Sequence, residues 1–455
     1  MKFINFKFSV FYFLLVAVAS AAEPLPLSKD YWKDETFLKS FNGSYRINAR
    51  IEPNVTTEEM NLLVSIKELM ADGKRKEALG KLEASALVKS SAAVAFNAGN
   101  IQFELGGLKQ AADYYQSALK IFPSFRRAHR GLGFVYVREN DWDKALASLS
   151  EAIRLGDQDG STYGQLAYGR MHKDQYASAL QAFRLAQITQ PENIDWKAGV
   201  AQCLQHLKRN EEALALLDEV IAVRPQEVSY YLLQSSIHLA MERQDEAITN
   251  LDLVRRMGQL NAENHLLLAN LHLRAGNNHL ARPLLMEALG MEAKPPLVST
   301  LNTLEFITQT GDWKLARDFA LTTDKEYERN KGKLEQKQRR LTALIQIESG
   351  DDPEVGAATL ERLVKTDPLD ADSLFLLGRY RASEKRYEFA EMLFQQAQRI
   401  DGHKYNVSLE LAKLYVATSR YSDALKQLDS ALSIRQSDVI QRYRQAVANL
   451  AEAAR

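Results

Sequence analysis

The chain has 455 residues, of which 46% are hydrophobic and 25% are charged, and this balance excludes a globally disordered protein. Lys+Arg and Asp+Glu each total 58, so neither nucleic acid nor an anionic membrane surface is expected as the main partner. The single cysteine, Cys203, excludes an intramolecular disulfide and a cysteine-based zinc site. Its apolar neighbours in a predicted helix indicate a small buried side chain rather than a reactive thiol.

Residues 1–22 have the pattern of a signal peptide. Lys2 and Lys7 precede an apolar run over residues 8–18, and small residues then offer a cleavage site after Ala21 or Ala22. The run is too short to span a bilayer comfortably, and no later stretch approaches ~20 apolar residues. We therefore expect an exported protein with no integral membrane segment after cleavage. It would be periplasmic in a double-membrane bacterium, and secreted or in a secretory lumen in another host.

Residues 23–58 form an aromatic-rich stretch. Its prolines and the pair Asn42-Gly43 interrupt any long helix, yet it carries more aromatic side chains than a free linker. We expect it to pack as an irregular cap on the first repeat of the array that follows. A self-binding or partner-binding arm is the alternative.

A helical hairpin recurs from residue 59 onward. In the clearest copy, residues 126–156, small or apolar residues recur at helical spacing on a first helix and again on a second. The residue that opens the second helix returns at intervals of 33 to 35, with one interval of 40. This marker series is Ala78, Ala111, Ala145, Ala179, Ala213, Ala247, Ala281, Ala316, Gly356, Ala390 and Ala424. A large side chain follows most markers by four residues, which fits close packing of small against large residues between helices.

The repeated unit resembles the tetratricopeptide repeat. Leu132, Gly133 and Tyr136, followed by Ala145 and Leu149, match its Leu-Gly-x-x-Tyr and Ala-x-x-x-large pattern on a period of 34 residues. The resemblance covers residues 59–434. It implies an all-α fold, an α-solenoid superhelix of about eleven helical hairpins whose first helices line a concave groove for a partner's peptide or helix.

Departures from the repeat predict the domain boundaries. Ala320 stands where a large residue is expected, and the interval of 40 follows it. We therefore predict an array over 59–296, an irregular repeat with an insertion over 297–336, and a second array over 337–436. Residues 437–455 are expected to form a capping helix with one apolar face, made of Val439, Tyr443, Val447 and Leu450.

No catalytic motif is present. Phosphate-binding loops, nucleophile elbows and His-Glu-x-x-His are all missing. His265, His272 and His279 recur at intervals of seven, but the third falls beyond a Gly-Asn-Asn turn, so packing or surface roles are favoured over a metal site. We expect no catalytic residues, no metal and no cofactor.

The family resemblance assigns candidate groove positions. Carried onto this sequence, they are Phe96, Asn100, Phe103, Arg127, Arg130, Phe134, Arg138, Tyr168, Met171 and His172. Arginine can bind carboxylates and stack on aromatic rings, so this basic and aromatic strip predicts an acidic or C-terminal peptide as ligand. The alternative is that the arginines are solvated and pair with Glu104 or Glu139. Further along, Leu232, Leu239, Leu266 and Leu273 predict a more apolar groove.

The sequence thus predicts a non-catalytic scaffold or adaptor of the cell envelope. Gly43-Ser44-Tyr45, Ile51-Glu52-Pro53 and the stretch 122–128 also show a looser resemblance to exported tetratricopeptide proteins that accompany TonB–ExbB–ExbD systems. That resemblance implies a partner in such a transport complex. A periplasmic assembly or chaperone-like factor is the alternative, and the missing motifs disfavour an enzyme or a sugar-binding processing factor.

Overall fold

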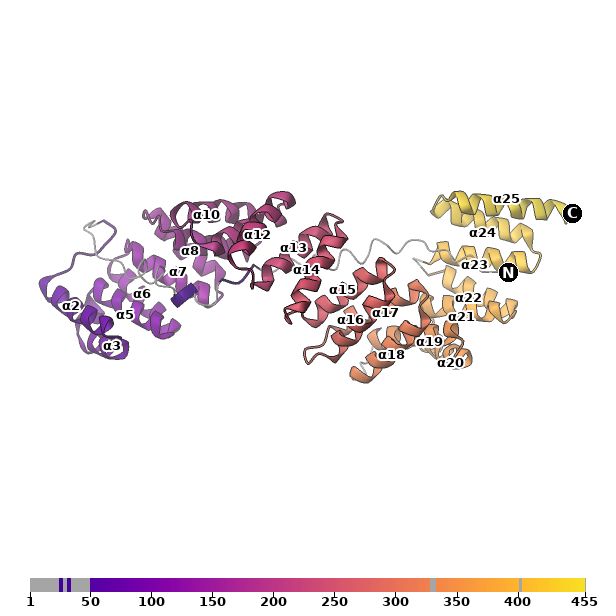
Figure 1. Ribbon diagram of the computed structural model, residues 1–455, viewed down its shortest axis with the longest axis horizontal. Helices are drawn as coiled ribbons and strands as arrows, with labels where there is room; N and C mark the ends of the chain where they lie inside the picture. Colours follow the sequence, from indigo (N-terminus) through magenta and orange to yellow (C-terminus); the bar gives the residue numbers. More distant parts are fainter. Residues whose placement is uncertain (1–23, 28–30, 34–49, 328–332, 401–402, 455) are drawn as a thin grey trace. The chain divides into compact units, whose positions relative to one another are not determined.

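A computed structural model describes residues 24–27, 31–33, 50–327, 333–400 and 403–454 (Figure 1). The predicted signal peptide and the Gly43-Ser44-Tyr45 motif lie outside these residues. Within them the chain forms two compact units, one ending at Val254 and the other beginning at Arg255. None of the described helices is both long enough and apolar enough to cross a membrane.

The described residues form 24 α-helices and one short 3-10 helix, which confirms the predicted all-α fold. Eleven hairpins follow one another along the chain. Their first helices are α2 (Thr57–Ala71), α5 (Ala92–Leu105), α7 (Arg126–Arg138), α9 (Gly160–Met171), α11 (Ile194–His206), α13 (Val228–Ala240), α15 (Ala262–Arg274), α17 (Leu297–Thr310), α19 (Lys333–Ser349), α21 (Ala371–Ser383) and α23 (Lys404–Ala417). Their second helices are α3 (Arg75–Ala84), α6 (Leu108–Ile121), α8 (Trp142–Arg154), α10 (Tyr176–Thr189), α12 (Asn210–Val223), α14 (Gln244–Arg256), α16 (Asn278–Gly290), α18 (Trp313–Glu326), α20 (Pro353–Thr366), α22 (Tyr387–Gln398) and α24 (Tyr421–Ile434). The remaining elements are η1 (Tyr31–Lys33), α4 (Leu87–Ser90) and α25 (Asp438–Ala453).

In several hairpins a small residue on the first helix packs against a large one on the second. A Cβ added to Gly99 would lie 2.7 Å from the ring of Tyr115, and one added to Gly378 would lie 2.7 Å from the ring of Phe394. Both rings are fully buried. The two helices can therefore approach closely only because the first helix carries no side chain at this point.

The irregular repeat exchanges the two sizes at these positions. Leu304 occupies the small position of α17, while Ala320 occupies the large position of α18, and both are buried. The extra length continues into α19, which has 17 residues where α17 has 14. The helices of this repeat pack on neighbours on both sides, and the division between the compact units falls at Val254 and Arg255.

The turn inside a hairpin places one residue in the left-handed region at the same repeat position. Glycine fills it in some hairpins, for example Gly276 with φ 76°, and other residues fill it elsewhere, for example Lys385 with φ 62°. The next residue donates its N–H to a carbonyl five residues back, as Asn277 does to His272 at 2.8 Å. This closes the first helix in a Schellman-type turn.

The terminal helix α25 packs on α24, but its buried face differs from the predicted one. Ile440 and Val447 are buried, whereas Val439 and Leu450 are 44% and 46% exposed. The predicted apolar face was therefore wrong for its first and last members.

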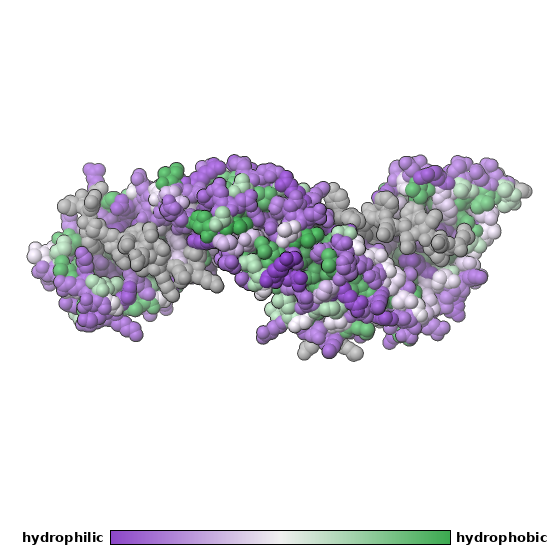
Figure 2. Space-filling model, in the orientation of Figure 1, coloured by the Kyte–Doolittle hydropathy of each residue, from purple (hydrophilic) through white to green (hydrophobic). Residues whose placement is uncertain are grey.

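Hydrophilic residues make up most of the coloured surface in Figure 2.

The shared left-handed position gives a stability prediction. Lys385→Gly should raise the unfolding free energy of the 255–455 unit by about 0.5–1 kcal/mol, because glycine adopts this φ without the steric cost of a Cβ. Gly276→Ala should lower it by about 1 kcal/mol, since a Cβ there meets no neighbouring atom and only the backbone is strained. Urea unfolding followed by circular dichroism measures both. Lys385→Ala should match wild type; a loss of stability in Lys385→Gly would contradict the prediction.

Candidate partner-binding surface

The candidate residues lie on α5, α7 and α9, with His172 directly after α9. We define the inner face as the surface that they form together with the corresponding positions of α11 and α13. This face is not open in the structure. It is covered by the N-terminal segment, defined as the described residues 24–27, 31–33 and 50–53. The alternative of a self-binding arm, rather than a cap on the first repeat, therefore matches the contacts of these residues.

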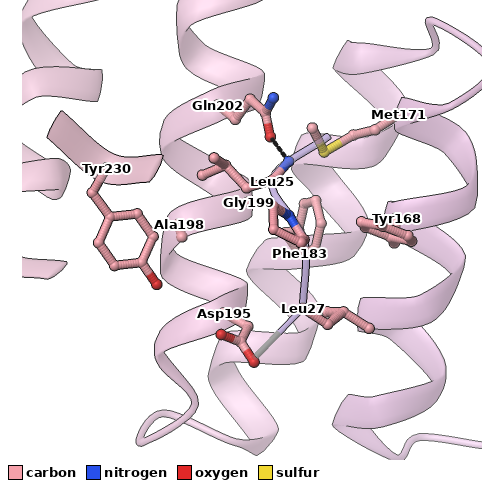
Figure 3. Close-up of a pocket in the computed structure, with 11 residues that line it drawn as sticks. Leu25, Leu27, Tyr168, Met171, Phe183, Asp195, Ala198, Gly199, Gln202 and Tyr230 are labelled. Carbon is pink, nitrogen blue, oxygen red and sulfur yellow. Dashed lines mark hydrogen bonds between the residues drawn. The ribbon is translucent and has the colours of Figure 1, made fainter. Parts of the chain in front are cut away.

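The first stretch of the N-terminal segment lies between α9 and α11 (Figure 3). The backbone N–H of Leu25 donates to Oε1 of Gln202 at 2.6 Å. Leu25 and Leu27 pack beside Tyr168 and Met171, two residues of the predicted strip. The cavity left beside them measures about 10 Å³, so the segment nearly fills the space between the helices.

Tyr31 in η1 is the most deeply buried aromatic residue of the N-terminal segment. It is 4% exposed, and its ring meets the ring of Trp196 edge-on with centroids 5.5 Å apart. Burial raises the pKa of its hydroxyl well above the usual value. The phenol is thus kept in its neutral form.

Trp32 contacts three members of the predicted strip. Its ring lies edge-on to Phe103 and Phe134, with centroids 5.9 and 6.1 Å away. The guanidinium of Arg138 lies over the rings of Phe103 and Trp32, at 4.9 and 5.9 Å, and donates to the carbonyl of Phe103 at 3.2 Å. Partial burial lowers the pKa of Arg138. The predicted stacking of arginine on aromatic rings is present, with Trp32 as the ring supplied by the segment.

Glu52 supplies the acidic group of the N-terminal segment. Its carboxylate accepts a hydrogen bond from Nε of Arg127 at 3.0 Å and lies 2.9 Å from a terminal nitrogen of the same guanidinium. Arg126 adds a longer ion pair at 3.5 Å, and its backbone N–H donates to the carbonyl of Ile51 at 3.1 Å. A carboxylate at the amino end of α7 is favoured by the helix dipole as well as by the arginines.

Arg130 does not face a ligand. Its guanidinium lies 3.8 Å from Asp157 and 3.6 Å from Asp159, and its side chain is 8% exposed. The alternative of solvated arginines pairing with Glu104 or Glu139 is wrong for Arg127 and Arg130, since both are buried and have other partners. Glu104 instead binds Arg75 at 2.8 Å.

The other three predicted residues serve packing within the array. Phe96 lies 4.9 Å from the ring of Phe125. Asn100 accepts a hydrogen bond from the hydroxyl of Tyr115 at 2.8 Å. His172 stacks on a tryptophan of the preceding hairpin, 3.9 Å between centroids. Contacts with the segment are therefore made by Phe103, Arg127, Phe134, Arg138, Tyr168 and Met171.

Sequence reasoning missed the part of the site on α11. Asp195, Ala198 and Gln202 line the cavity around Leu25, and they occupy in the fifth hairpin the repeat positions of Arg127, Arg130 and Phe134 in the third. The same positional rule, applied one hairpin further, would have found them. Ala198 leaves room for the chain to approach α11.

The predicted apolar groove further along is wrong for three of its four leucines. Leu239, Leu266 and Leu273 are exposed by only 9%, 2% and 4%, and Leu232 is half-buried. They belong to helix packing rather than to an open surface.

The described residues show no constellation typical of a catalytic or metal site. They contain no group of three metal-ligating side chains. His265 has its Nδ1 2.9 Å from the carbonyl of Asn261 within its own helix. Cys203 is buried, and burial raises its pKa to about 12.

Models of the tetratricopeptide repeat match residues 65–124, 96–160, 170–237, 342–404 and 381–453. Together these ranges cover more than half of the chain. The chain belongs to the tetratricopeptide repeat family. The predicted recognition is thereby confirmed, and proteins of this family typically serve as non-catalytic scaffolds that bind other proteins.

Individual relatives of this tetratricopeptide repeat protein match only parts of it. Superkiller protein 3 of Schizosaccharomyces pombe is 24% identical over 215 residues, 46% of this chain and 16% of that protein. The TPR repeat-containing protein YpiA of Bacillus subtilis is 28% identical over 124 residues, 27% of this chain and 29% of that protein. The chain thus spans less than a third of either relative. Among solved structures, pilF of Pseudomonas aeruginosa matches with a TM-score of 0.39 and 18% identity, over 48% of this chain and 97% of that one.

The pair of Glu52 and Arg127 can be tested by a double-mutant cycle. Glu52→Gln and Arg127→Met should each destabilise the unit that ends at Val254, because each leaves the other group buried without its partner. The double variant should lose less unfolding free energy than the two single variants together, and this difference, the coupling energy, should be about 1–3 kcal/mol. Urea unfolding provides the four free energies.

An exposed pair on α8 provides the matched control. Glu151→Gln and Arg154→Met break an ion pair whose side chains are 31% and 69% exposed, so their coupling should be much smaller than that of the buried pair. Equal coupling in the two cycles would show that the segment does not bury the pair.

The buried thiol predicts low reactivity. Cys203 in the folded chain should react with a thiol reagent at pH 8 orders of magnitude more slowly than in urea, since burial both blocks access and raises the pKa to about 12. Following colour release with a disulfide reagent measures this. Rapid reaction of the native chain would contradict the burial of α11.

Proposed function

We propose that this protein is an exported, non-catalytic scaffold that holds an extended segment of a protein partner on the inner face. One observation carries the proposal: the inner face already holds a chain segment. It does so through a hydrogen bond that the backbone N–H of Leu25 donates to Gln202, through apolar contacts around Leu25, and through a buried carboxylate on Arg127. These are the contacts by which repeat grooves recognise peptides.

The compartment follows from the signal peptide expected at residues 1–22, and a periplasmic location is part of the proposal. Lys2, Lys7 and the apolar run support export.

A transport complex of the TonB–ExbB–ExbD type is the proposed setting. Two of the three stretches behind the looser resemblance, 51–53 and 122–128, meet in the structure, where Arg126 and Arg127 hold Glu52 and Arg126 holds the carbonyl of Ile51. These two stretches therefore belong to one structural feature, the contact that anchors the N-terminal segment. An acidic ligand group is supported at the same point, because Arg127 binds a carboxylate.

Capture from the cell envelope tests the proposal. A C-terminally tagged chain is crosslinked in the envelope fraction, purified, and compared with Arg138→Glu on the inner face and with Arg154→Glu, an exposed control on α8. We expect Arg154→Glu to recover the wild-type partners and Arg138→Glu to recover them several-fold less, while both variants keep the helical circular dichroism of wild type. N-terminal sequencing of the purified chain should begin at Ala22 or Glu23.

Three outcomes contradict parts of the proposal. Identical partners from both variants would exclude the inner face. Recovery of general envelope chaperones and porins alone would support an assembly or chaperone-like factor instead of the transport complex. A chain that retains Met1 would overturn export.

A further inference from the structure

The N-terminal segment crosses the inner face against the order of the repeats. Leu25 lies on α11, Tyr31 lies between α9 and α11, and Trp32 reaches Phe103 on α5 and Phe134 on α7. Its contacts fall at three separate sites, which we call stations. The aliphatic station is Leu25 and Leu27, the aromatic station is Tyr31 and Trp32, and the acidic station is Glu52. The segment is therefore held by a few side-chain anchors, as a bound peptide is, and does not pack as another helical repeat.

We propose that the inner face is a site for an extended aliphatic, aromatic and acidic segment of a partner protein, and that the N-terminal segment is its resident intramolecular competitor. This inference rests on the proposed function and specifies the ligand of the same site. The partner segment would present an aliphatic pair, an aromatic pair and, further along its chain, one carboxylate.

Two arginines that contact the segment also have contacts within the array, which would keep them in place during such an exchange. Arg127 lies over the rings of Phe96 and Phe125, at 5.3 and 5.8 Å, in addition to binding Glu52. Arg138 donates a hydrogen bond to the carbonyl of Phe103, an atom of the array and not of the segment. Each guanidinium thus has a second partner within the array, which lowers the cost of releasing the segment.

The packing of the hairpins is independent of the segment. The close contacts that hold the helices together, such as Gly99 with Tyr115 and Gly199 with Phe183, use residues of the array alone. The segment contributes one three-residue helical turn, η1, and otherwise no regular structure. Its release would leave these helix pairs in place.

The charges of the site define where a ligand carboxylate is accepted. Arg130 is already neutralised by Asp157 and Asp159, and Asp159 and Asp195 lie near the hydroxyl of Tyr31. A second acidic group there would meet like charges. The site therefore favours a neutral aromatic residue at the position of Tyr31 and a carboxylate at Arg127.

The tether explains why a partner would bind weakly to the resting chain. A segment joined to its own site has an effective concentration of about 1 mM. If the resident segment has an intrinsic Kd of about 100 µM, a competing peptide would then bind about tenfold more weakly to wild type than to a chain whose own segment has been weakened.

A labelled peptide copying residues 23–53 provides the probe. Its binding by fluorescence anisotropy is compared between full-length wild type and full-length Tyr31→Ala/Trp32→Ala, which keeps the inner face intact but removes the aromatic station of the resident segment. We expect at least tenfold tighter binding to the variant. Adding Gln202→Ala to that variant should weaken binding again, and so should Glu52→Ala in the peptide.

A second variant covers a failure to fold. If Tyr31→Ala/Trp32→Ala loses its helical circular dichroism, Leu25→Asp weakens the aliphatic station instead, with the same expected gain. Equal affinity for wild type and the folded variant, or no binding to either, overturns the inference. A concentration-dependent dimer that the peptide dissociates would also overturn it, since the occupant would then be a second copy of this chain. Failure of the peptide assay with envelope partners still captured leaves the scaffold proposal standing.

Discussion

The fold depends on how closely the two helices of a hairpin can approach. A residue with little or no side chain on the first helix admits a large residue of the second, as Gly99 admits Tyr115 and Gly378 admits Phe394. The contact recurs at a nearly constant interval, so successive hairpins bury the same kind of surface. The irregular repeat departs from this pattern, because Leu304 and Ala320 exchange the two sizes, although both remain buried.

The sequence could predict this framework because the framework is periodic. The marker residues, the hairpin boundaries and the burial of Cys203 all follow from spacing and local composition. The partner of Arg127 could not be predicted in this way. Glu52 lies 75 positions away in a stretch without a repeat, and only the folded chain brings the two together. The exposed Val439 and Leu450 were missed for a related reason, since a helical pattern does not reveal which part of an apolar face its neighbour covers.

The arginines of the candidate strip differ in the partners that they bind, and their repeat positions do not indicate this difference. Arg127 and Arg130 occupy the same helix and are about equally buried. One meets an acid of the N-terminal segment, and the other meets acids that belong to the array itself. A basic residue in a repeat groove therefore indicates ligand binding only when the array supplies it with no carboxylate. The same test separates Arg138, which is paired with rings and a carbonyl, from a solvated lysine or arginine.

The hydrogen bond between Leu25 and Gln202 joins residues 177 positions apart. Nearly every other contact in a repeat array is made within a hairpin or with the next one, so such arrays tend to gain and lose structure piecewise along their length. The described residues of the N-terminal segment contact the second to fifth hairpins, so fraying of any one of these hairpins removes part of the contacts that hold the segment. The contact with α11 can form only after that hairpin has folded. The N-terminal segment thus links otherwise independent repeats into one cooperative block.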